Sequence, residues 1–379
     1  MSYDDIRPYH DDEVNHYIHE LLKDEVFGKV LMFIFQTEPK VREIRQTLAD
    51  IQTVDELQTK FMYPLINSWI ISRTTNGVTC SGLDALDRTQ SYLFISNHRD
   101  IILDAALMNY IIFNAGMKTT EIAIGNNLLI YNWIEYAVKL NRAFVVKRNL
   151  PAKELFAASQ QLSAYIRESI TRNNDSVWIA QREGRTKDGN DQTQSALIKM
   201  LNLSNTKSLI EGFRDLKIVP LAISYEREPC GISKVEEIYK RTYETYVKKP
   251  QDDLKSMAFG LIKPKGRVHF AFGAPVDAQL DDIIRTDNVN EAVVQLSEYI
   301  DSCIYLNYQL RPYNYLATDM LRGENKYAAM IDAPVREKFN EMLDDLVATI
   351  NSGDAAIQRD LFLKMYAAPL LNKEKLPAE

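Results

Sequence analysis

The middle of the chain, from about residue 76 to residue 280, alternates short runs of β-branched and aromatic residues with longer segments of helical periodicity. Turn residues bound each run, as is typical of short strands. The alternation predicts an α/β fold with a mixed, largely parallel sheet flanked by helices. The predicted strands are Tyr92–Ile95, Glu121–Ile124, Ala143–Val146, Val177–Ala180, Ile218–Ser224 and Val268–Phe272.

The segment Pro151–Ile170 is the clearest helix between these strands, because Pro151 suits a first helical turn. Its apolar residues recur at helical spacing, which predicts one buried face. That face comprises Leu155, Leu162, Tyr165, Ile166 and Ile170.

Both ends of the chain have helical periodicity and lack strand-like runs. At 379 residues, the chain exceeds a typical single domain of roughly 100–200 residues. We therefore expect an N-terminal helical region at 1–75, an α/β domain at 76–287 and a C-terminal helical region at 288–379. The C-terminal region has a clear apolar stripe, made of Val335, Phe339, Leu343, Leu346 and Ile350.

Two apolar segments of the N-terminal region, Phe27–Phe35 and Phe61–Ile71, fit either a packed helical core or a surface that contacts a membrane. We expect most of their side chains to pack in a core. No uninterrupted apolar run approaches the roughly 20 residues needed to cross a bilayer. A lipid substrate would therefore be met from the membrane surface.

The charge and the cysteines exclude several classes of protein. A net charge of −7 and a pI of about 5.5 argue against a nucleic-acid binder. Cys80, Cys230 and Cys303 are far apart and form no CxxC pair, which fits neither a disulfide framework nor a zinc site. The N-terminus is acidic and polar, unlike a signal or transit peptide. We expect a protein of the reducing cytoplasm.

One of the five histidines, His98, stands where chemistry is expected. It follows the strand at Tyr92–Ile95 and precedes the predicted helix Ile101–Phe113, and ligands bind at the carboxyl ends of strands in α/β sheets. Asp100 is well placed to cap that helix. The other four histidines, His10, His16, His19 and His269, have ordinary surface or strand interpretations.

Asp104 lies one turn into this helix among apolar neighbours. A carboxylate in such a setting costs several kcal/mol (order of magnitude) unless it is paired and hydrogen-bonded. His98 is the nearest histidine that could donate to it, which would leave the second ring nitrogen free to accept a proton. A solvent-facing Asp104 is the alternative interpretation.

Basic residues follow two further strands. Lys147 and Arg148 come after Ala143–Val146, and the segment Arg182-Glu183-Gly184-Arg185 comes after Val177–Ala180. If the strands are parallel neighbours, these ends meet at one edge of the sheet, where several cations would suit a phosphate group. Solvated loop charges are the alternative. Pro220 within the run Ile218–Ser224 predicts an edge strand or a bulge.

Taken together, these segments resemble the glycerolipid acyltransferase superfamily, in the family's order over roughly residues 78–276. NHRDIILD, which contains His98 and Asp104, is similar to the family's His-x4-Asp motif, with five intervening residues here instead of four. The other matching segments are VTCSGLDAL at Val78–Leu86, IGNNLL at Ile124–Leu129, RAFVVKR at Arg142–Arg148, AQREGRTKDG at Ala180–Gly189, VPLAISYER at Val219–Arg227 and GRVHFAFGAPV at Gly266–Val276.

The extra residue constrains the local structure. On a continuous helix, a step of six residues turns about 240°, so His98 must lie in the turn before the helix. Asp100 is the fallback partner if it does not. In the third block, Gln181-Arg182 replaces the usual Phe-Pro and Arg185 directly follows Gly184. Whether Arg182 or Arg185 meets the phosphate is open.

The resemblance implies an acyltransferase that uses acyl-CoA or acyl carrier protein as donor and glycerol 3-phosphate or lysophosphatidate as acceptor. His98 would be the general base, and Asp104 would hold it. Lys147, Arg148, Arg182, Glu183, Gly184 and Arg185 would contact the acceptor, and Pro220 belongs to the block that lines the acyl site.

The same resemblance implies no metal or organic cofactor, and a cytoplasmic location peripheral to the inner membrane surface. An amine or amino-acid lipid acceptor is an alternative, and so is a non-catalytic lipid-binding relative.

Overall fold

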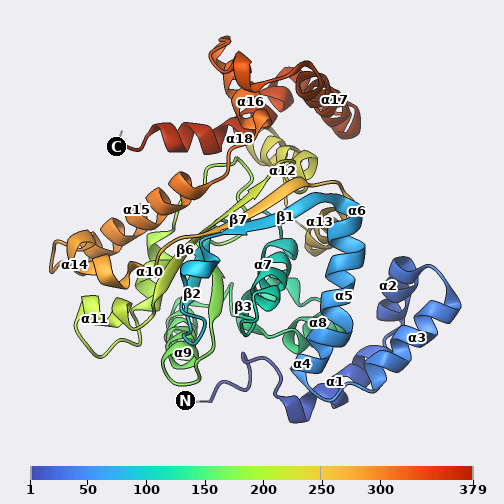
Figure 1. The fold of residues 1–379 in the computed structure, drawn as a ribbon, viewed down its shortest axis with the longest axis vertical. Coiled ribbons are helices and arrows are strands. Elements are labelled where there is room, and N and C mark those ends of the chain that lie inside the picture. The colour runs from blue at the N-terminus through green and yellow to red at the C-terminus, as the bar shows by residue number, and fades with distance from the viewer. Residues whose placement is uncertain (1, 248, 378–379) are drawn as a thin grey trace.

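The computed structural model describes residues 2–247 and 249–377. Its centre is a seven-stranded sheet in the order β1-β7-β6-β2-β5-β3-β4 (Figure 1). All neighbouring strands are parallel except β6 and β7, which are antiparallel. The mixed, largely parallel sheet predicted from the alternating runs is confirmed. The strands are β1 (Thr75–Ser81), β2 (Leu93–Ser96), β3 (Glu121–Gly125), β4 (Ala143–Val146), β5 (Val177–Ala180), β6 (Ile218–Tyr225) and β7 (Gly266–Phe272).

Helices cover both faces of the sheet, which is why its central strands are apolar throughout. In β2, Leu93 and Ile95 enter one core layer, whereas Phe94, together with Tyr92 just before the strand, enters the other. The first layer packs against α9 (Ala152–Thr171), α10 (Ser195–Leu201) and α15 (Val289–Asn307). The second packs against α7 (Leu103–Asn114). The middle of the chain also contains α8 (Asn132–Leu140), α11 (Leu209–Arg214), α13 (Pro250–Ile262) and α14 (Leu280–Ile283), besides α12 (Gly231–Tyr243), which packs with the C-terminal helices.

The N-terminal helices form their own core cluster together with α8. Phe27, Phe61 and Leu31 are buried there, as expected of a packed helical core, whereas Phe33 is 60% exposed. The elements are α1 (Asp11–Lys23), α2 (Glu25–Phe35), α3 (Glu38–Ala49) and a helical run of α4 (Val54–Leu57), η1 (Gln58–Met62), α5 (Tyr63–Leu65), η2 (Ile66–Ile71) and α6 (Ser72–Thr74).

The C-terminal helices pack against α12 (Gly231–Tyr243) in a separate cluster, at the end of the molecule opposite the N-terminal helices (Figure 1). They are α16 (Pro312–Arg322), α17 (Ala333–Ile350) and α18 (Ala355–Glu374). Among the described residues, no helix is both long and apolar enough to cross a membrane.

Two local expectations are wrong. Leu155 is 42% exposed, because the first two turns of α9 are exposed and only its later turns pack on the sheet. Pro220 lies in an interior strand, with β7 and β2 on its two sides, and not at an edge. Its carbonyl accepts from the Gly273 N–H, 2.8 Å away, just beyond the end of β7. Because a strand residue's N–H and carbonyl point to the same side, the N–H that Pro220 lacks would face the end of the pairing with β7, and its absence interrupts no hydrogen bond between β6 and β2.

Candidate active site

His98 lies in the turn between β2 and α7, where the extra residue is absorbed. The strand ends at Ser96 and the helix begins at Leu103. His98 Nδ1 is 2.9 Å from Asp104 Oδ2, and the two side chains are 14% and 0% exposed. The predicted pair is therefore in contact, and Nε2 is the ring nitrogen not engaged by Asp104.

Asp104 is held by three further donors. Its Oδ2 accepts the backbone N–H groups of Arg99, at 2.6 Å, and Asp100, at 2.9 Å. Its Oδ1 accepts the hydroxyl of Tyr225, the last residue of β6, at 2.9 Å. Burying a carboxylate is tolerable only with such donors, so these bonds account for the fully buried position of Asp104.

Asp100 is a cap and does not contact His98 through any described hydrogen bond. Its Oδ1 accepts the N–H groups of Ile102 and Leu103, both at 2.9 Å, as the sequence predicted. Burial raises the pKa of Asp100, and the nearby Asp104 raises it further. Its Oδ2 faces α13, because a Cβ added to Gly260 would lie 2.2 Å from that oxygen.

Residues distant in sequence hold the loop that carries His98. The Asn97 side chain bonds both to the Ile223 carbonyl, at 2.9 Å, and to the Ile223 N–H, at 2.7 Å. The Thr186 N–H donates to the His98 carbonyl at 2.8 Å. The Trp178 ring stands edge-on to the imidazole, with centroids 5.7 Å apart. Sequence reasoning missed these supports, and their sequence separations leave no local signal.

Arg99 was also missed. Its side chain is fully buried between Asp191 and Glu228, with the guanidinium 5.4 Å from the Tyr308 ring centre. Burial raises the pKa of Asp191, and the Arg99 guanidinium opposes that rise. Lys234 donates to the Arg99 carbonyl at 2.6 Å. The residue after His98 is thus anchored in a buried charged cluster.

Two of the predicted basic residues, Arg148 and Lys147, are neighbours in sequence but pair with different parts of the molecule. Arg148 reaches the loop after β5, with its Nη1 3.4 Å from Glu183 Oε1. Gly125 leaves room for it, since a Cβ there would lie 2.9 Å from the Arg148 guanidinium carbon. Lys147, on the alternate position, pairs with Asp5 of the N-terminal segment instead.

Arg185 is the basic residue tied most directly to the His98 loop. It precedes Thr186, whose N–H holds the His98 carbonyl, and its guanidinium lowers the pKa of Asp100 against the larger effect of burial. Gly184, in the left-handed region at φ 73°, makes the turn before it. Arg185 Nη2 is 3.9 Å from Asp253 Oδ1 on α13, whereas Arg182 has no described ion pair.

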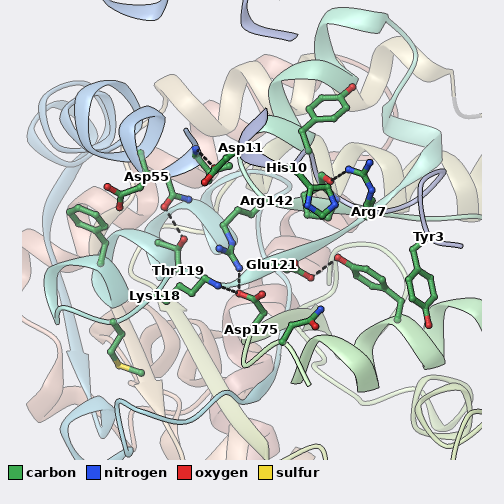
Figure 2. Close-up of a pocket in the computed structure, with 18 of the residues that line it drawn as sticks. Tyr3, Arg7, His10, Asp11, Asp55, Lys118, Thr119, Glu121, Arg142 and Asp175 are labelled. Carbon is green, nitrogen blue, oxygen red and sulfur yellow. Dashed lines mark hydrogen bonds and ion pairs between the residues drawn. The ribbon is translucent and has the colours of Figure 1, made fainter. Parts of the chain in front are cut away.

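A cavity of about 970 Å³ opens where strands β3, β4 and β5 begin, at the ends of these strands opposite their carboxyl ends (Figure 2). It is lined by Glu121 at the start of β3, Arg142 before β4 and Asp175 before β5. Arg142 and Lys118 both pair with Asp175. Burial raises the pKa of Glu121, which accepts from the hydroxyl of Tyr165 at 2.7 Å. None of the residues predicted for the site lines this cavity.

Similarity to known proteins indicates the family of the α/β domain. Residues 77–224 match the family model described as Acyltransferase. No curated protein matches the chain. Among solved structures, the chain is similar to the 1-acyl-sn-glycerophosphate (LPA) acyltransferase PlsC from Thermotoga maritima. The sequence identity is 12% and the TM-score 0.36, with 76% of this chain and 92% of that chain covered. The family match confirms the predicted resemblance to the glycerolipid acyltransferase superfamily and identifies residues 77–224 as an acyltransferase domain.

Proposed function

We propose that this acyltransferase moves a fatty acyl group from acyl-CoA or acyl carrier protein to a hydroxyl of glycerol 3-phosphate or lysophosphatidate. The observation that carries the proposal is the hydrogen bond between His98 Nδ1 and Asp104 Oδ2. An ionised carboxylate only accepts, so the imidazole donates from Nδ1, and in the neutral ring the lone pair is then on Nε2. That nitrogen is the general base.

The reaction then needs no covalent enzyme intermediate. His98 takes the proton of the acceptor hydroxyl as its oxygen attacks the thioester carbonyl carbon. The C–S bond breaks, and His98 returns the proton to the departing thiolate. Asp104 stabilises the imidazolium in between. A positioned base contributes about 10²–10⁴-fold to such a rate.

The arginines at the carboxyl edge support a phosphate-bearing acceptor. Arg185 is joined to the His98 loop through Thr186, so we assign the phosphate to Arg185 rather than to Arg182. Arg148 approaches the same loop through Glu183. Gly184 makes the turn before Arg185, and Lys147 pairs with Asp5 of the N-terminal segment. Pro220, paired with Ile95 of β2, belongs to the strand we assign to the acyl side.

We further propose that the protein acts at the cytoplasmic face of the inner membrane as a peripheral protein. The partly exposed Phe33 and Val26 of α2 are candidates for contact with that surface. An amine or amino-acid lipid acceptor would leave the buried Arg185 without a phosphate to bind, which makes it the second choice.

The test offers labelled acyl-CoA and labelled acyl carrier protein to the purified protein, each with glycerol 3-phosphate and lysophosphatidate in parallel. We expect His98→Ala to lower transfer by about 10²–10⁴-fold and to keep its thermal stability. His19→Ala, exposed on α1, is the matched control and should transfer normally. Unchanged transfer by His98→Ala would refute the base. No transfer to any acceptor by the wild-type protein would refute the reaction.

A further inference from the structure

Tyr225 is a buried hydroxyl that bonds directly to the partner of His98. It is 3% exposed and lies 121 residues after Asp104 in the chain, yet its hydroxyl is 2.9 Å from Asp104 Oδ1. The other three described hydrogen bonds of Asp104 all go to Oδ2, from His98 Nδ1 and two backbone N–H groups. Tyr225 is therefore the donor that occupies the second oxygen.

We propose that Tyr225 is a positioning residue of the His98–Asp104 pair: its hydroxyl fixes the plane of the Asp104 carboxylate and disperses its negative charge, and so sets the proton affinity of His98. The proposal rests on the function proposed above, because it assigns a role within the same site.

The geometry supports a positioning role in preference to packing alone. A carboxylate bound only through Oδ2 can rotate about the bond to its Cβ, and Oδ2 would then leave His98. A donor on Oδ1 that comes from a different element of the sheet prevents that rotation. Tyr225 ends β6, which pairs with β2, the strand that leads to His98. The strand that leads to His98 and the strand that carries Tyr225 are thus neighbours in the sheet.

The Tyr225 hydroxyl remains a donor over the working range, since burial raises the pKa of Tyr225 well above 10 and the nearby Asp104 raises it further. Without the hydroxyl, Oδ1 would be a buried acceptor with no partner, which is costly. The less dispersed charge of Asp104 would then attract the imidazolium more strongly, and His98 would hold its proton to a higher pH.

Several other ionisable groups face this site. Asp100 lies on the same turn, Arg185 on the loop after β5, Glu228 and Cys230 before α12, and Lys265 before β7. Among the described residues, none of the five side chains hydrogen-bonds to Asp104. They form a fixed background that substitution of Tyr225 leaves in place.

The test measures His98 itself. The protein is labelled with ¹⁵N-histidine, and NMR follows His98 as pH is varied. It reports the ring tautomer and the midpoint, which is the pH at which His98 is half protonated. The signal is identified by its absence in His98→Ala. In Tyr225→Phe we expect the His98 midpoint to rise by roughly half a unit or more. In the labelled transfer assay, kcat should fall about tenfold with little change in the acceptor KM, and the acid limb of the pH profile should move up with the NMR midpoint.

Two controls separate this role from simple packing. Tyr92→Phe removes another buried hydroxyl, which bonds to the backbone of Asp87, and should leave the His98 midpoint unchanged. In an Asp104→Asn background, Tyr225→Phe should cause no further shift, because the effect passes through Asp104. A wild-type midpoint and tautomer in Tyr225→Phe would overturn the proposal, as would an equal shift in Tyr92→Phe. The NMR readout needs no turnover, so it decides on Tyr225 even if the transfer assay refutes the proposed reaction.

Discussion

At the scale of single residues, backbone geometry decides whether the unusual His98–Asp104 spacing can work. The turn from Asn97 to Ile102 lets Asp104 accept from the backbone of the two residues that follow His98. The longer turn between His98 and Asp104 thus places two backbone N–H groups against the Asp104 carboxylate. Burial of Asp104 among apolar neighbours predicted this pair better than the family spacing did.

Lys265 is a buried cation that lacks a described ion pair. It is 1% exposed, and its Nζ donates to Thr74 Oγ1 at 2.9 Å and to the Leu261 carbonyl at 3.0 Å. Burial lowers the pKa of Lys265 to about 8, from an ordinary value of 10.5. Between these two values the unfolded chain binds more protons than the folded one, so this group makes stability rise with pH and lowers it as pH falls toward 8.

We predict that Lys265→Met removes the increase of stability with pH that is due to this side chain. The free energy of unfolding of the wild-type protein should increase by on the order of 2–3 kcal/mol more than that of Lys265→Met between about pH 8 and pH 10.5. Urea denaturation at pH 7.5, 9 and 10.5 measures the difference. Lys263→Met, at an exposed position two residues earlier, should behave like the wild-type protein. Parallel curves for the wild-type protein and Lys265→Met would contradict the prediction.

At the scale of elements, α13 covers the turn that carries His98. Gly260 lets the helix backbone come close to Asp100, and Asp253 lies near Arg185. The six strands predicted from periodicity agree with the structure within one or two residues, as for β3, β4 and β5, whereas β1 was not among them. No sequence pattern predicted that α13 packs over this turn, because the packing depends on how closely Gly260 approaches the distant carboxylate of Asp100.

Gly260→Ala tests this contact. The added Cβ would lie 2.2 Å from Asp100 Oδ2, so α13 must shift, and we expect a loss of roughly 1–3 kcal/mol of stability. Amide hydrogen exchange of α13 should also accelerate. Gly28→Ala is the matched control within helix α2, because its nearest neighbour would be 3.8 Å away. It should stabilise the protein by about 1 kcal/mol. Equal stability of the two variants would show that α13 does not pack tightly on the turn.

At the scale of the whole molecule, the helices after residue 287 share a core with the sheet. Helix α15 contributes Val293, Leu296 and Ile300 to the cluster that contains Leu93 and Ile95 of β2. Tyr308, just after α15, stacks on the buried Arg99 guanidinium. The predicted boundary at 287/288 separates segments that differ in periodicity but pack together.

We expect a chain shortened to residues 1–287 to lose cooperative unfolding, because one apolar face of the sheet would be exposed to water. Near-UV circular dichroism and thermal melting measure this. Removal of the residues after Glu374, the end of α18, is the control and should leave the transition cooperative. A native-like melt of residues 1–287 would instead support an independent acyltransferase domain.

The sequence alone determined the features that local chemistry controls. Periodicity of two or 3.6 residues predicts strands and helices, the strand ends singled out His98 and the basic residues as candidates, and the apolar surroundings in the helix singled out Asp104. The tertiary structure decided which distant groups meet: Tyr225 on Asp104, Trp178 beside His98, and Arg99 between Asp191 and Glu228. It also placed Pro220 in an interior strand and turned Lys147 toward Asp5. Such contacts join residues tens to more than a hundred positions apart, and only the packing of the sheet and its helices brings them within hydrogen-bonding distance.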